Sequence, residues 1–110
     1  MSERTTNRVA VVTGGASGIG LGVARRFAAD GHLVAVLDRN ASAAETAADE
    51  LRSQGATAVA VEVDVADRAS VDSAFDRVRA ELGRVAILVT SAGIESFDPL
   101  FYGMSDWASW

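Results

Sequence analysis

The chain has 110 residues, of which 49% are hydrophobic, so it can form one domain with a buried core. Its formal net charge is -5 and its acidic residues are interspersed with arginines, which excludes a basic surface for nucleic acid or a cationic face for anionic lipid. It has no cysteine and a single histidine, which excludes a disulfide framework and a cysteine or histidine metal site.

The first expected element is a buried strand over residues 9–13, because this apolar run shows no alternation. A glycine-rich turn follows, and apolar residues then recur at helical spacing from Ile19 to about Asp30, where Gly31 supplies a left-handed C-cap. A second buried strand covers residues 33–37 and ends at Asp38.

An alanine-rich helix is predicted from Asn40 to Gln54, with Ser42 and Glu45 spaced as a capping box and Gly55 ending it. Valines alternate with other residues over 59–65, which predicts a third strand whose end carries Asp64.

Asp67 is expected to cap a third helix, which Gly83 ends. The apolar face of this helix consists of Val71, Ala74, Phe75, Val78 and Leu82. Residues 85–89 are predicted to form a fourth buried strand.

This order of strands and helices predicts a parallel sheet wound by right-handed crossovers. With the glycine-rich turn after the first strand, the expected fold is a three-layer α/β/α unit of the Rossmann type, with strand order 3-2-1-4. We treat residues 1–110 as one domain. Residues 94–110 show no clean periodicity, and the fourth strand would be an apolar edge with unpaired backbone groups. The domain is therefore expected to be half of a doubly wound sheet, incomplete at its fourth strand.

The turn after the first strand has the spacing Thr-Gly-x-x-x-Gly-x-Gly, from Thr13 to Gly20. Its glycines let the backbone turn tightly and approach a ligand, and the amides that open the next helix point at that ligand. We expect this turn to bind the pyrophosphate of a dinucleotide. Asp38 can accept both ribose hydroxyls of an adenosine and would repel a 2′-phosphate, so NAD is expected rather than NADP. Arg39, next to it, could instead serve a 2′-phosphate.

These features, with Asp64-Val65 and the strand that ends in Thr90-Ser91-Ala92-Gly93, resemble the N-terminal half of the short-chain dehydrogenase/reductase family over about residues 8–99. The resemblance implies that Asp64 binds the adenine amino group and that Val65 offers a backbone contact. It also implies that residues 90–93, where the family usually has Asn-Asn-Ala-Gly, support the sheet beside the nicotinamide ribose. The expected cofactor-binding residues are Gly14, Ser17, Gly18, Ile19, Gly20, Asp38, Arg39, Asp64, Val65, Ser91, Ala92 and Gly93.

The family's catalytic asparagine, serine and Tyr-x-x-x-Lys are not matched. All ten basic residues are arginine, and Tyr102 is followed four residues later by Asp106, where an acid would raise the pKa of a phenol rather than lower it. We assign no catalytic residue and no metal ligand.

The sequence is consistent with two hypotheses about function. In the first, the chain is the cofactor-binding portion of an NAD-dependent enzyme that oxidises an alcohol or reduces a ketone, with the complete form a homo-oligomer. In the second, it is a catalytically silent dinucleotide-binding module, or a truncated or frameshifted product without function. Residues 1–8 lack the apolar core of a signal peptide and no apolar run approaches the roughly 20 residues that span a bilayer, so a cytoplasmic location is expected. The substrate stays open.

Overall fold

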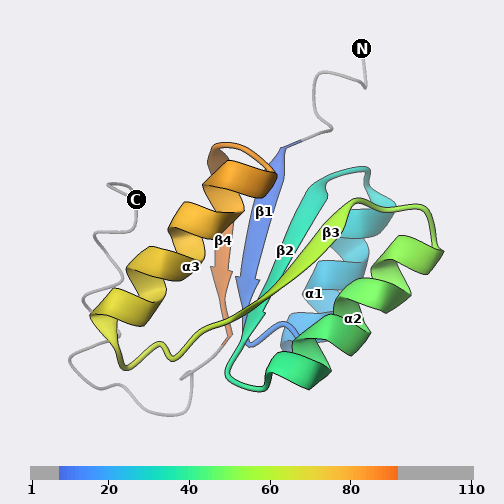
Figure 1. The fold of residues 1–110 in the computed structure, drawn as a ribbon. Coiled ribbons are helices and arrows are strands. Elements are labelled where there is room, and N and C mark those ends of the chain that lie inside the picture. Colours follow the sequence, from blue (N-terminus) through green and yellow to red (C-terminus); the bar gives the residue numbers. More distant parts are fainter. Residues whose placement is uncertain (1–7, 92–110) are drawn as a thin grey trace.

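The computed structural model describes residues 8–91, in which strands and helices alternate along the chain. The elements are β1 (Val9–Thr13), α1 (Gly18–Ala29), β2 (Leu33–Asp38), α2 (Ala41–Ser53), β3 (Ala58–Glu62), α3 (Arg68–Glu81) and β4 (Val85–Thr90). The strands pair in parallel in the order β3-β2-β1-β4. Figure 1 shows α3 on one face of the sheet and α1 and α2 on the other. The predicted three-layer Rossmann-type fold and its strand order are therefore confirmed.

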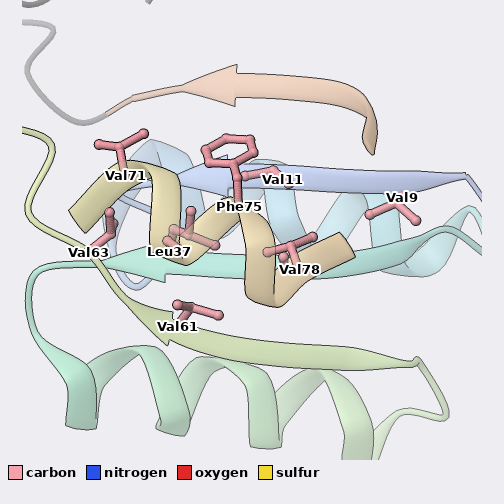
Figure 2. Close-up of a cluster of buried hydrophobic side chains, with 10 residues drawn as sticks. Val9, Val11, Leu37, Val61, Val63, Val71, Phe75 and Val78 are labelled. Atoms are coloured by element: carbon pink, nitrogen blue, oxygen red, sulfur yellow. The ribbon is translucent and has the colours of Figure 1, made fainter. Parts of the chain in front are cut away.

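One hydrophobic cluster lies between α3 and the sheet. Phe75 is 1% exposed, and it is flanked on the same helix face by Val71, Ala74 and Val78, as the periodicity predicted. Figure 2 shows Val71, Phe75 and Val78 of α3 among the side chains of the strands, which include Val11, Leu37 and Val61. Burying a side chain as large as phenylalanine stabilises the fold by about 1.5–3 kcal/mol, so this face is a main source of stability.

A second cluster fills the opposite face, where α1 and α2 pack on the sheet. The helix positions in contact are mostly alanine, which leaves little side chain between helix and strand. The buried helix residues are Ala24, Ala44, Ala47, Ala48 and Leu51, and they pack against Val12, Val34 and Val36. The apolar runs of β1 and β2 are explained by this arrangement, because both of their faces are covered.

The capping box predicted at Ser42 and Glu45 is wrong. The N-cap of α2 is Asn40, whose side chain accepts a hydrogen bond from the backbone N–H of Ala43 at 3.0 Å. The Ser42 hydroxyl donates to the Asn40 side chain instead, and Glu45 pairs with Arg52 at 2.9 Å. The prediction for the next helix is confirmed, because the Asp67 side chain accepts from the first amides of α3.

Two strands also differ from expectation. The strand β3 ends at Glu62, and its last backbone hydrogen bond to β2 runs from the N–H of Val63 to the Asp38 carbonyl at 3.0 Å. Asp64 therefore lies in the loop that follows and not at the strand end. The fourth strand was expected to be buried, but its residues are half-buried or exposed. In the described part of the sheet β4 is an edge strand with β1 as its neighbour, so solvent reaches one side of it. No helix within residues 8–91 is long and apolar enough to cross a membrane.

Candidate functional site

The glycine-rich turn lies at the carboxyl ends of β1 and β2 and is fixed to β2 by backbone hydrogen bonds. The N–H of Gly14 donates to the Leu37 carbonyl at 2.7 Å, and the N–H of Gly15 donates to the same oxygen at 3.3 Å. Gly14 and Gly18 have φ values of 69° and 58°, in the left-handed region that side chains other than glycine rarely adopt. Two of the three expected glycines are thus required by backbone conformation.

Gly20 is required for a different reason, the close approach of neighbouring backbone. A Cβ built on it would lie 2.6 Å from the Ser91 hydroxyl and 2.8 Å from the carbonyl carbon of Gly14, and closer still to that carbonyl's oxygen. The first turn of α1 therefore rests directly on the glycine turn. Gly15, which the sequence interpretation did not single out, is also crowded, because its Cβ would lie 2.9 Å from the Val12 carbonyl oxygen.

The N-terminus of α1 has no side-chain cap, unlike those of α2 and α3. Ser17 is the N-cap residue, yet its side chain makes no capping hydrogen bond, and the first turn carries no acidic residue. The first amides of a helix have no partner within the helix, and its N-terminus carries partial positive charge. A Cβ at Gly18 would meet nothing within 4 Å, so there is open space beside these amides. The next residue, Ile19, is 77% exposed.

Asp38 ends β2 next to this turn, and its carboxylate is bound to backbone on both sides. One oxygen accepts from the N–H of Ala16 at 3.2 Å, and the other accepts from the N–H of Asn40 at 3.1 Å. Asp38 is half-buried. Since each carboxylate oxygen has two acceptor sites, both oxygens can accept one further hydrogen bond. The structure thus brings Asp38 and the glycine turn together.

A hollow of about 320 Å³ opens beside the loop after β3. Its lining consists of Arg39, Glu62, Val63, Asp64 and Ser70. The Asp64 side chain accepts from the N–H of Ala66 at 3.0 Å, and the Asp64 N–H donates to the Ser70 hydroxyl at 3.0 Å. Two expected site residues, Arg39 and Asp64, therefore share this hollow.

Val65 does not line the hollow. It is half-buried and packs against the cluster beneath α3. Three residues that do line it, Glu62, Val63 and Ser70, were not among the site residues expected from the sequence.

Ser91 joins the end of β4 to the end of β1. Its N–H and its hydroxyl both donate to the carbonyl of Thr13, at 3.1 Å and 2.5 Å. A serine thus forms a side-chain bond at a position where the resemblance has asparagine. The neighbouring expected residues, Ala92 and Gly93, lie outside the described residues. Within residues 8–91, no group of three or more histidine, aspartate or glutamate side chains is placed to hold a metal ion.

The chain is similar to known proteins in sequence and in fold. The chain is 43% identical over 107 residues to D-threitol dehydrogenase of Mycolicibacterium smegmatis, covering 96% of this chain and 41% of that protein. It is 44% identical over 102 residues to L-2,3-butanediol dehydrogenase of Corynebacterium glutamicum, covering 86% of this chain and 37% of that protein. Among solved structures, hydroxysteroid dehydrogenase from Escherichia coli superposes with a TM-score of 0.74 at 35% identity, covering 76% of this chain and 34% of the other. The chain spans less than half the length of these relatives.

A family model described as short chain dehydrogenase matches residues 8–108. This match takes in the described fold and the glycine turn. It confirms the resemblance seen in the sequence: the chain belongs to the short-chain dehydrogenase family.

Proposed function

We propose that the chain is the cofactor-binding part of an NAD-dependent dehydrogenase that transfers hydride between an alcohol or ketone and the nicotinamide. The observation that carries this proposal is the uncapped N-terminus of α1, which lies against a turn where Gly20 admits no side chain. The two relatives described above are named as dehydrogenases of D-threitol and of L-2,3-butanediol. Both names denote compounds with hydroxyl groups, which supports the alcohol class.

The pyrophosphate of the dinucleotide would lie at the first amides of α1. The backbone N–H groups of residues 17–20 would donate to it, and the helix dipole would favour its negative charge. The pyrophosphate has room at this place because Gly18 has no side chain and the space beside it is open, with no atom within 4 Å of a Cβ built there. Gly14 would shape the turn and the exposed Ile19 side chain would lie over the bound ligand.

The adenosine half would extend toward the ends of β2 and β3. Asp38 would accept the hydroxyls of the adenosine ribose with the acceptor sites that its two backbone hydrogen bonds leave open. Asp64 would contact the adenine amino group from the hollow, Val65 would offer its backbone, and Arg39 would border the ribose. NAD is proposed over NADP because a 2′-phosphate would meet the Asp38 carboxylate.

The nicotinamide half would extend the other way, toward the end of β4. Ser91 is fixed to the carbonyl of Thr13 and would position the backbone that follows it. The roles of Ala92 and Gly93 in this region are part of the proposal. Bound NAD supplies a hydride acceptor, and the residues of this chain bind and orient it.

A second candidate function is a dinucleotide-binding module that performs no reaction alone. It is favoured by one feature of the sequence, the absence of lysine among ten basic residues. In the family's reaction a lysine lowers the pKa of the tyrosine that exchanges a proton, and Tyr102 has Asp106 at the corresponding spacing.

An equilibrium titration of the 110-residue chain with NAD and with NADP tests the proposal. The wild type should bind NAD more tightly, and Asp38→Ala should lose that preference. Asp49→Ala is the matched control, because Asp49 is an exposed α2 residue paired with Arg52 and should leave the preference unchanged. Binding of neither dinucleotide would contradict the proposed function, and unchanged selectivity in Asp38→Ala would contradict the role of Asp38. Formation of NADH from an alcohol distinguishes an enzyme from a silent module.

A further inference from the structure

We infer that Glu62 is a second specificity-determining carboxylate of the dinucleotide site and disfavours a 2′-phosphate together with Asp38. The inference rests on the proposed function, since it assumes that an adenosine ribose lies at the end of β2. It adds a residue from a different strand, which the sequence interpretation did not include.

The pairing of β2 with β3 places Glu62 beside Asp38. The two residues are register partners in these parallel strands, and neighbouring strands lie about 4.8 Å apart. Partners in this sheet share a face: Val36 and Ala60 belong to the cluster beneath α1 and α2, whereas Leu37 and Val61 belong to the cluster beneath α3. Because side chains alternate along a strand, the next pair returns to the face of α1 and α2. That face carries the glycine turn, to which Asp38 is bonded.

The charges of the two carboxylates are offset to different degrees. Asp38 accepts hydrogen bonds from two backbone amides, so part of its charge is compensated. Glu62 is exposed and forms no hydrogen bond or ion pair with any residue in the range 8–91. Its charge therefore acts on whatever occupies the neighbouring hollow.

Arg39 is the residue that could reverse the selectivity. It lines the hollow with Glu62 and Asp64, and it too has no ion pair within the described range. A guanidinium in this position would attract a 2′-phosphate, which carries close to two negative charges. Glu62 and Asp64 lie in the same hollow and oppose that attraction. Glu62 thus reinforces Asp38 in keeping Arg39 from recruiting NADP.

This arrangement predicts a selective effect. A ribose hydroxyl has no charge, so removing the Glu62 charge should change NAD affinity little. A phosphate would gain the interaction with Arg39, and exposed charge pairs of this kind change affinity by roughly three- to fivefold. Removing both acids should favour NADP more than either single change does, because a residual carboxylate still repels the phosphate.

The test is a titration of the full chain with NAD and NADP, comparing wild type, Glu62→Gln, Asp38→Asn and the double variant. Asparagine is used at position 38 because its carbonyl can still accept from the N–H of Ala16. Glu81→Gln is the control for net charge, since Glu81 ends α3 two residues before Gly83, which lies beside Val9 at the start of β1, and Glu81 pairs with Arg77. Circular dichroism should show that all variants are folded.

We expect the ratio of the NADP to the NAD dissociation constant to fall roughly three- to fivefold in Glu62→Gln, mainly through tighter NADP binding, and to be unchanged in Glu81→Gln. The effect should shrink at high salt, because screening weakens interactions between exposed charges. The role of Glu62 would be overturned if this ratio of dissociation constants were the same in wild type and Glu62→Gln. It would also be overturned if Glu62→Gln and Glu81→Gln changed the ratio equally, and in both cases the proposed NAD binding would stand. If the wild type binds neither dinucleotide, the proposed function fails and the inference fails with it.

Discussion

Gly20 packs against Gly14 so closely that a Cβ on Gly20 would lie 2.8 Å from the Gly14 carbonyl carbon. Alanine at position 20 must therefore push the first turn of α1 away from the glycine turn. We expect Gly20→Ala to destabilise the chain by about 1–3 kcal/mol, the usual cost of overpacking. It should also weaken NAD binding at least tenfold, since the amides of α1 move with the turn.

Gly22→Ala is the matched control for this prediction. Gly22 lies on the same helix two residues further on, and a Cβ there would meet nothing within 4 Å. Alanine favours a helix interior by about 0.5–1 kcal/mol over glycine, so this variant should be as stable as wild type or more so. Urea denaturation and NAD titration measure both quantities. If Gly20→Ala and Gly22→Ala had similar free energies of unfolding and similar NAD affinities, the contact between Gly20 and Gly14 would be unimportant.

The Ser91 hydroxyl, which donates to the carbonyl of Thr13 at 2.5 Å, should contribute to stability. A partly buried hydrogen bond of this kind contributes about 1 kcal/mol, so Ser91→Ala should lower the free energy of unfolding by about that amount. Ser53→Ala is the comparison, because the Ser53 hydroxyl donates to the carbonyl of Glu50 on an exposed surface and its loss should cost less. Equal losses measured by urea denaturation would argue against a special role for the Ser91 bond.

The correction at the start of α2 gives a direct comparison of two neighbouring residues. Asn40→Ala removes the acceptor for the Ala43 amide and should destabilise the chain by about 1 kcal/mol. Ser42→Ala should cost only a few tenths of a kcal/mol, because Ser42 does not cap the helix backbone. Thermal denaturation of the two variants measures the stability that each substitution removes. A larger loss of stability in Ser42→Ala than in Asn40→Ala would show that Ser42 is the helix cap, as the capping box predicted.

The ion pair between Arg25 and Glu50 links α1 to α2 and should make stability depend on pH. A hydrogen bond from the Arg25 guanidinium, 2.6 Å long, lowers the pKa of Glu50 below its ordinary value. A carboxyl whose folded pKa is lowered stabilises the fold above its unfolded pKa, here about 4.3, and loses this contribution as pH falls through the folded value.

Glu50→Gln should therefore be slightly less stable than wild type at pH 7, and the difference should vanish in acid below the folded pKa of Glu50. The effect is expected to be small because both side chains are exposed to solvent and screened. Urea denaturation between pH 3 and pH 7 measures the difference, with pH values chosen around the unfolded pKa of about 4.3. A difference that persists or grows in acid would contradict this role of the pair.

Much of the fold could be predicted because its signals are local. The apolar runs of β1 and β2, the periodicity of α3 and the glycines with positive φ each act through their own neighbourhood in the chain. The alternation of strands and helices predicted a parallel sheet, and the order 3-2-1-4 is that of the dinucleotide-binding fold that the glycine turn indicates. The cap of α2 could not be decided, because Asn40 and Ser42 are both good capping residues and only the backbone conformation selects one.

The site was harder to predict, because part of it comes from pairing between strands. Glu62 gains its position from its register with Asp38, which no spacing along the chain reveals. The bond between Asp38 and the N–H of Ala16 likewise joins segments that the sequence does not show to be in contact. Gly15 was missed because its restriction arises from Val12 and Val36 packed around it and not from an unusual φ.

The central claim is that the amides opening α1 bind the pyrophosphate of a dinucleotide. Two-dimensional ¹H–¹⁵N NMR of the chain during titration with NAD tests it most directly, because each backbone amide is observed separately. We predict that the largest shifts occur at residues 17–20, with smaller ones near Asp38 and around the hollow that Asp64 and Ser70 line. The amide of Ala43, which the Asn40 side chain already caps, should shift less. Saturable NAD binding that leaves residues 17–20 unshifted, or no shift at any amide, would contradict the claim.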